Sequence, residues 1–180
     1  MICEGVSQLS SDLPSIECAI CNNISDEEMF LFVYHTANLR SFTTRISDFC
    51  SDVDLSDLNI VQLTHLNIRL ENNGLFESVY HFLGQCSNLI DLEFRCWSTK
   101  VDKDMFDPDG WQNLIEECLS HLLYLNIRFY RHTPIISDNN FNDRFVQSDY
   151  WINRQPDFDI KVTTNRVIFT NHQYDCFLYL

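Results

Sequence analysis

The middle of this chain repeats one eight-residue pattern, and the repetition restricts the possible fold more than any other feature of the sequence. The clearest copies occupy residues 63–70 (LTHLNIRL), 89–96 (LIDLEFRC) and 122–129 (LLYLNIRF), and looser copies occupy 13–20 (LPSIECAI) and 39–46 (LRSFTTRI). Their starts are 26, 24, 26 and 33 residues apart. Self-similarity at such a spacing is typical of a solenoid, in which one supersecondary unit stacks on the next.

Within each copy, apolar and polar residues alternate. Counted from the first residue of each copy, positions four, six and eight are apolar in fourteen of fifteen cases, Thr44 being the exception, and positions five and seven are polar except at Ala19. In the first copy the inward positions are Ile16, Cys18 and Ile20. Alternation with a period of two predicts a strand that has one face buried and the other in water. We therefore expect five such strands to lie side by side.

Three segments between the copies are expected to be helical: residues 25–34, 75–84 and 111–119. The first begins with a capping box, in which Ser25 is followed three residues later by Glu28. In the third, Asp109 and Gln112 have the same separation. Strands that alternate with helices require a parallel sheet with right-handed crossovers.

One of the repeat units resembles a known family. Residues 86–94 (CSNLIDLEF) are similar to the cysteine-containing leucine-rich repeats of F-box proteins, which carry a Cys-x-x-Leu-x-x-Leu-x-apolar core. Cys21 falls at position nine of the first copy, where leucine-rich repeats place Asn or Cys. The resemblance covers residues 13–129 and implies a protein-binding solenoid, such as the substrate-recognition part of an F-box-like ubiquitin ligase receptor. No F-box motif is visible in the sequence.

The last fifty residues break the period. Residues 131–150 are polar, and residues 158–162 then alternate before a turn leads into residues 166–169. This pattern predicts an antiparallel hairpin, and Trp151 and Phe158 are expected to pack it against the last repeat as a cap, because a solenoid must protect its terminal edge. The N-terminal edge, in contrast, is expected to be bare unless residues 1–12 fold over it.

The predicted fold is therefore α/β. Residues 1–130 are expected to form a degenerate leucine-rich-repeat-like solenoid of about five parallel strands with helices on the convex side. Residues 131–180 are expected to form an irregular loop and the C-terminal capping hairpin.

Composition narrows the possible partners and the compartment. The net charge of −14 argues against nucleic acid, whose recognition needs an electropositive surface. The N-terminus resembles no signal peptide, and no apolar stretch approaches the roughly 18 residues of a membrane span. We therefore expect a cytoplasmic or nuclear protein that binds neither nucleic acid nor membrane. Its oligomeric state is not indicated by the sequence.

No residue pattern indicates catalysis, a cofactor or a metal ion. The eight cysteines are expected to be reduced thiols, and the Cys18–Cys21 pair lacks the second ligand pair of a zinc site. The six histidines have no zinc-protease spacing, and the acidic residues 101–110 lack the glycine and glutamate of a calcium-binding EF-hand loop. The chain is expected not to be an enzyme.

The polar side of the strands carries one unusual feature, an arginine at position seven of four consecutive copies. These four, with four neighbours at position five, form the predicted protein-binding site: Arg45, Arg69, Arg95, Arg128, Thr43, Asn67, Glu93 and Asn126. Adjacent strands are ~4.8 Å apart, so the arginines would form a column on the exposed, concave face. Such a column favours an acidic or phosphorylated segment of a protein partner. Internal neutralisation by Glu17, Glu93 and acidic loop residues is the alternative interpretation.

The sequence thus predicts a non-enzymatic protein-interaction module. A second hypothesis is an acidic inhibitor or scaffold that captures a basic partner on its acidic loops, through Asp48, Asp52, Asp54 and Asp57.

Overall fold

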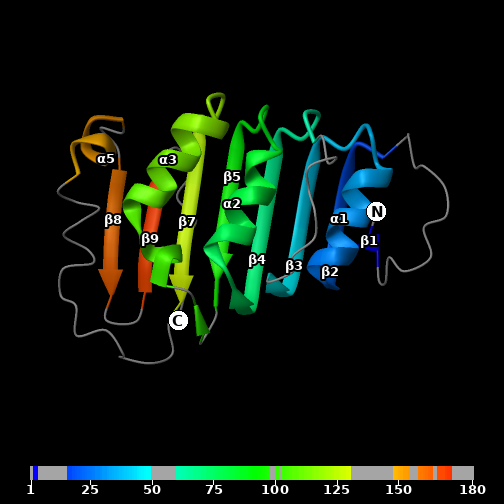
Figure 1. Cartoon of the computed structure of the whole chain (residues 1–180), viewed down its shortest axis with the longest axis horizontal. Helices are drawn as coiled ribbons and strands as arrows, with labels where there is room; N and C mark the ends of the chain where they lie inside the picture. The colour runs from blue at the N-terminus through cyan, green and yellow to red at the C-terminus, as the bar shows by residue number, and fades with distance from the viewer. Residues whose placement is uncertain are drawn as a thin grey trace.

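The chain folds as a parallel β-sheet with helices on one side (Figure 1). A computed structural model describes residues 2–3, 16–49, 60–97, 100–101, 103–130, 148–154, 158–163 and 166–171. Five strands lie side by side in chain order and all run parallel: β2 (Cys18–Ile24), β3 (Ser41–Phe49), β4 (His65–Gly74), β5 (Asp91–Cys96) and β7 (Tyr124–Tyr130). The predicted α/β class and its five parallel strands are confirmed.

Short or antiparallel strands extend this sheet. The strand β1 (Ile2–Cys3) runs parallel to β2, and β6 (Lys100–Val101) pairs with the end of β4. At the other side, β9 (Arg166–Asn171) pairs antiparallel with both β7 and β8 (Phe158–Thr163). The N-terminal edge of the repeats is therefore not bare, because residues 2–3 of the segment expected to cover it if it folded back pair with the outer side of β2.

Three helices lie on the same side of the sheet (Figure 1). They are α1 (Asp26–His35), α2 (Phe76–Gly84) and α3 (Pro108–Cys118). Two shorter helical segments among the described residues are η1 (Lys103–Phe106) and α5 (Asp149–Arg154). The capping box of α1 forms as predicted: the Glu28 amide donates to Ser25 Oγ at 3.1 Å, and the Ser25 amide donates to the Glu28 carboxylate at 3.0 Å.

The start of α3 differs from the prediction. Asp107 is the N-cap residue and Pro108 the first helical residue, so Asp109 already lies inside the helix and the predicted capping box with Gln112 is wrong. Proline is well suited to the first helical position, because its missing N–H would have no intrahelical partner there.

The core lies between the sheet and the helices, and aromatic rings fill it. Phe30 of α1 contacts Phe49 of β3 and Phe82 of α2, with ring centroids 5.9 and 5.5 Å apart. Phe94 of β5 packs on Trp111 of α3 at 5.5 Å. Strand residues at positions four and six point into this layer from β3 onward. The fully or almost fully buried members are Phe42, Leu66, Ile68, Leu92, Phe94, Leu125 and Ile127, together with the polar Thr44.

The same turn precedes each of four strands. In it, the amide of the position-one leucine donates to the carbonyl three residues earlier; the four pairs are Leu39–Thr36, Leu63–Ile60, Leu89–Cys86 and Leu122–Leu119. Thr36 and Cys86 also donate their side-chain hydrogens to the carbonyls of Phe32 and Phe82, four residues back. The cysteine of the family-like unit therefore occupies a position that a small hydrogen-bonding side chain fills in another repeat.

The first copy of the repeat lies in a different frame from the predicted one. Ala19 and Cys21 are in register with Phe42 and Thr44, and both are buried, whereas Cys18 and Ile20 are exposed. The copy therefore starts at residue 16, not 13. A shift of three residues along a strand reverses the facing of its side chains, so the predicted inward positions of Cys18 and Ile20 are wrong, whereas Ile16 is partly buried against the core. The assignment of Cys21 to position nine is also wrong, because Cys21 is in register with Thr44, at position six of its copy.

The C-terminal part agrees with the prediction only where its side chains are described. Trp151 of α5 is buried against the core, as expected, whereas the Phe158 side chain lies outside the described set, as do residues 131–147. The helix α5 itself was not predicted. None of the helices in the described part of the chain has the length and apolar character needed to cross a bilayer.

Candidate binding face

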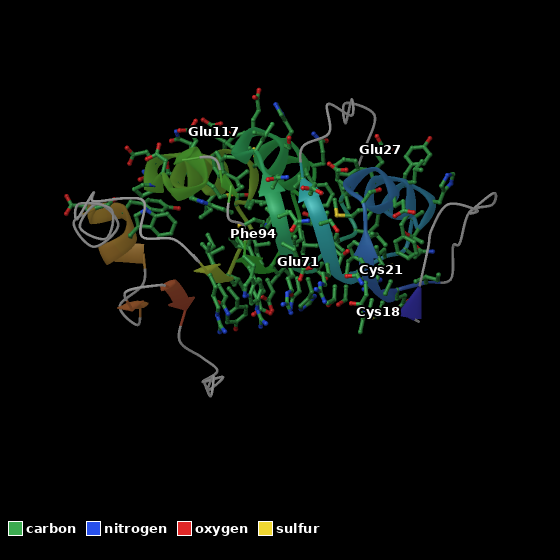
Figure 2. The ribbon with its side chains drawn as sticks, turned by 90° about the horizontal axis from the view of Figure 1, so that it is seen from below. Cys18, Cys21, Glu27, Glu71, Phe94 and Glu117 are labelled. Carbon is green, nitrogen blue, oxygen red and sulfur yellow. The ribbon has the colours of Figure 1, made fainter. Side chains whose placement is uncertain are left out.

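The four predicted arginines lie next to one another on neighbouring strands. Arg45 of β3 is in register with Arg69 of β4, Arg69 with Arg95 of β5, and Arg95 with Arg128 of β7. The predicted column exists, and we call these four residues the arginine row. They belong to the face of the sheet opposite the helices, from which side chains project away from the helical layer (Figure 2). This side of the sheet is called the open face.

A second row runs beside the first. The position-five residues Thr43, Asn67, Glu93 and Asn126 are also in register across the same strands. All four side chains are half-buried. The structure thus places all eight predicted residues together on one face.

Two of the arginines share one carboxylate. The Nε atoms of Arg45 and Arg69 both approach Glu71 Oε1, the latter at 3.2 Å. The guanidinium carbon of Arg69 also lies 4.0 Å from the centre of the Trp97 ring, a cation–π contact. Glu71 and Trp97 occupy position nine of their copies and were not among the predicted binding residues. Position nine has the same parity as seven, so extending the alternation by one step would have found both residues.

Glu93 is the second carboxylate among the arginines and has three partners. Arg95 Nε donates to Glu93 Oε1 at 2.7 Å, Asn67 Nδ2 donates to Oε2 at 2.5 Å, and Asn126 Nδ2 lies 3.4 Å from Oε1. Hydrogen bonds to a charged group are stronger than those between neutral groups. Glu93 therefore holds together three adjacent strands on the open face.

The arginines differ in how accessible they are. The side chains of Arg45 and Arg69 are each 41% exposed and that of Arg95 is 31% exposed, whereas Arg128 as a residue is only 5% exposed. Arg128 Nε donates to Asn126 Oδ1 at 3.1 Å. A partner on the open face would therefore reach three guanidiniums of the row far more easily than the fourth.

Charge within this network does not cancel. Three of the four guanidiniums pair with two carboxylates, and no carboxylate among the described side chains pairs with Arg128. Internal neutralisation is thus partial. It comes from Glu71 and Glu93, while Glu17, the other named candidate, forms no ion pair with the row in the part of the chain that the structure describes. The network keeps an excess of two positive charges in a chain whose net charge is −14.

The pKa values of two groups, one near the open face and one on the helical side, are shifted by burial. Burial raises the pKa of Asp91, and the Coulombic interaction with His65, its register partner on β4, partly opposes this rise. On the helical side, burial raises the pKa of the Cys86 thiol, which is therefore held in its protonated form. A protonated, buried thiol is a poor nucleophile or metal ligand.

The described residues do not form a thiol pair on one face of β2 or a cluster of metal ligands. Cys18 is exposed and Cys21 is buried, so the two thiols lie on opposite sides of β2. Among the described residues, no group of three or more His, Cys, Asp or Glu side chains could hold a metal ion.

No family model matches the chain, and no curated protein or solved structure matches it either.

Proposed function

We propose that this chain is a non-enzymatic protein-interaction module built as a degenerate leucine-rich-repeat-like solenoid of the cysteine-containing kind. The repeated turn before each strand supports this assignment, as does the order of the parallel strands. In four neighbouring pairs of repeats, the carbonyl at position two accepts hydrogen bonds from the two amides at positions two and three of the next copy; the acceptors are Glu17, Arg40, Thr64 and Ile90. A solenoid is defined by such identical contacts between successive units.

In the proposed solenoid, the hairpin β8–β9 protects the last parallel strand. Its pairing with β7 and the burial of Trp151 support this role, because an unpaired strand edge invites aggregation. The substrate-recognition part of an F-box-like ubiquitin ligase receptor remains the specific role that the family resemblance favours.

The open face is the proposed binding surface, and its partner is an acidic or phosphorylated segment of another protein. The single observation that carries this proposal is the in-register row of four arginines, which pairs with two carboxylates among the described side chains. Like charges directly opposite each other cost roughly 0.2–1 kcal/mol per pair. Glu71 and Glu93 offset this cost only in part, and a bound anionic partner would offset the rest.

Charge reversal of the central arginines tests the proposal. Arg69→Glu combined with Arg95→Glu should abolish capture of the partner from a native lysate, while circular dichroism and urea unfolding show an intact fold. Arg40→Glu is the matched control, since Arg40 is an exposed arginine at position two, outside the row. Capture that survives the double reversal would show that the arginine row is not the binding site. Capture lost instead on neutralising Asp48, Asp52, Asp54 and Asp57 would favour the acidic-inhibitor hypothesis.

A further inference from the structure

We propose that Glu71 is a resident counter-ion of the arginine row, and that Arg45 and Arg69 together bind a phosphoryl group of the partner by displacing it. The inference rests on the proposed function, which it narrows from acidic or phosphorylated segments to phosphorylated ones. It comes from a contrast between the two carboxylates on the open face.

Glu71 is held less firmly than Glu93. Both Nε atoms that approach Glu71 are buried, yet neither makes a hydrogen bond to an acceptor within the described part of the chain, so the contact is close but poorly directed. Glu93, in contrast, accepts directed hydrogen bonds from an arginine and from an asparagine. Displacing Glu71 therefore costs less than displacing Glu93.

Charge at the Arg45–Arg69 pair is unbalanced. Two guanidiniums share one carboxylate, which leaves one positive charge uncompensated by that contact. The arginine side chains are 41% exposed and the Glu71 side chain is 22% exposed, so a ligand would meet the guanidiniums before the carboxylate. Glu71 thus supplies part of the charge that the site requires and leaves the rest to a ligand.

A phosphoryl group matches this arrangement better than a carboxylate does. It carries about −1.5 to −2 charge at pH 7 and three acceptor oxygens, so it can neutralise two guanidiniums at once. The two arginines stand on strands ~4.8 Å apart, and each guanidinium can offer two parallel N–H donors to one oxyanion. Contact with Trp97 orients Arg69 in advance, which lowers the entropy lost on binding. A single carboxylate carries no more charge than Glu71, so replacing Glu71 with it would leave one guanidinium charge still uncompensated by the contact.

Removal of the Glu71 charge should therefore strengthen phosphoryl binding. The probes are two blocked tripeptides, alanine–phosphoserine–alanine and alanine–glutamate–alanine. Titrations would follow the arginine Nε–H resonances of the full chain by NMR, assigned with Arg45→Lys and Arg69→Lys. We expect the phosphoserine peptide to shift the Arg45 and Arg69 resonances, and the Glu71→Gln variant to bind it about tenfold more tightly than the wild type. The glutamate peptide should bind the wild type at least tenfold more weakly than the phosphoserine peptide.

Glu17→Gln is the matched control, since it removes an exposed carboxylate that forms no ion pair with the row among the described residues, and it should change the affinity less than threefold. Arg45→Gln should weaken phosphoserine binding about tenfold in a fold verified by the same spectra. Equal binding of the two peptides, no binding of either, or equal gains from Glu71→Gln and Glu17→Gln would overturn the inference. Such a failure differs from failure of the proposed function, which is decided by whether the Arg69 and Arg95 reversal abolishes partner capture.

Discussion

The two faces of the sheet are stabilised by different kinds of force, although their residues alternate along the same strands. The helix-facing side buries apolar side chains such as Phe94 completely, and this stabilisation is non-directional and is not screened by salt. The open face holds Arg95, the next residue, in a half-exposed network of directed ion pairs and hydrogen bonds. The comparison indicates that one face maintains the fold, while the other is free to carry a function at small energetic cost.

The largest expected difference between the faces is in the free energy of unfolding. Phe94→Ala should lower it by roughly 3–5 kcal/mol, because the truncation leaves a cavity against the Trp111 ring. Arg95→Ala, one residue away on the open face, should lower it by at most about 1 kcal/mol. Urea unfolding of both variants gives the two values, and equal losses would contradict the division between the faces.

Thiol reactivity should separate the two sides of β2. Cys18 is exposed and Cys21 is fully buried, so a thiol-alkylating reagent should modify Cys18 roughly a hundredfold faster in the native protein, because Cys21 reacts only after local opening. Peptide mass spectrometry at increasing reaction times measures both rates. The reverse order would restore the frame first predicted for this strand, with Cys18 inward.

Within the open face, Glu93 is expected to matter most for stability. Glu93→Gln removes the charge that binds Arg95, Asn67 and Asn126 and should lower the free energy of unfolding by about 1 kcal/mol, since the group is partly exposed and screened by water. The loss should shrink as salt is added. Glu17→Gln, at an exposed position, serves as the control and should change stability by less than about 0.3 kcal/mol.

The smallest effect concerns the outer surface of the helices and depends on pH. The hydrogen bond from Tyr80 Oη to Glu117, at 2.7 Å, is the main cause that raises the pKa of Tyr80 to about 12. Because the unfolded chain has the ordinary pKa of about 10, the stabilisation from neutral Tyr80 is complete below that pH and is lost as the pH rises towards 12. Tyrosinate absorbance in the wild type and in Tyr80→Phe checks this. Titration of Tyr80 at its ordinary pKa would show that the hydrogen bond is not formed in solution.

The repeat pattern and the helix signals were sufficient to predict much of this fold. The alternation in residues 39–46, 63–70, 89–96 and 122–129 correctly placed four strands and their buried positions, because side-chain direction in a strand follows a local period of two. The capping box at Ser25 and Glu28 likewise depends only on residues three apart. Such features are local in sequence, so they can be read without knowledge of the neighbouring strands.

The candidate site was predicted in outline but not in detail. The row of arginines followed from counting positions, whereas the shared contact at Glu71 and the burial of Arg128 did not. Which carboxylate meets which guanidinium depends on the rotamers of long side chains and on the register between strands 24 to 33 residues apart in the sequence. Extending the pattern to position nine would have added Glu71 and Trp97, but not their partners.

By itself, the amino-acid sequence determined that this protein alternates parallel strands with helices and that arginine recurs on one side of the sheet, because both features arise from short-range periodicity. The tertiary structure alone decided the frame of the first repeat. Residues 16–21 are apolar at both parities, apart from Glu17, so only hydrogen bonding to β3 selects Ala19 and Cys21 as the buried pair. The tertiary structure also decided which arginines stay accessible, since exposure depends on side chains brought together from distant parts of the chain.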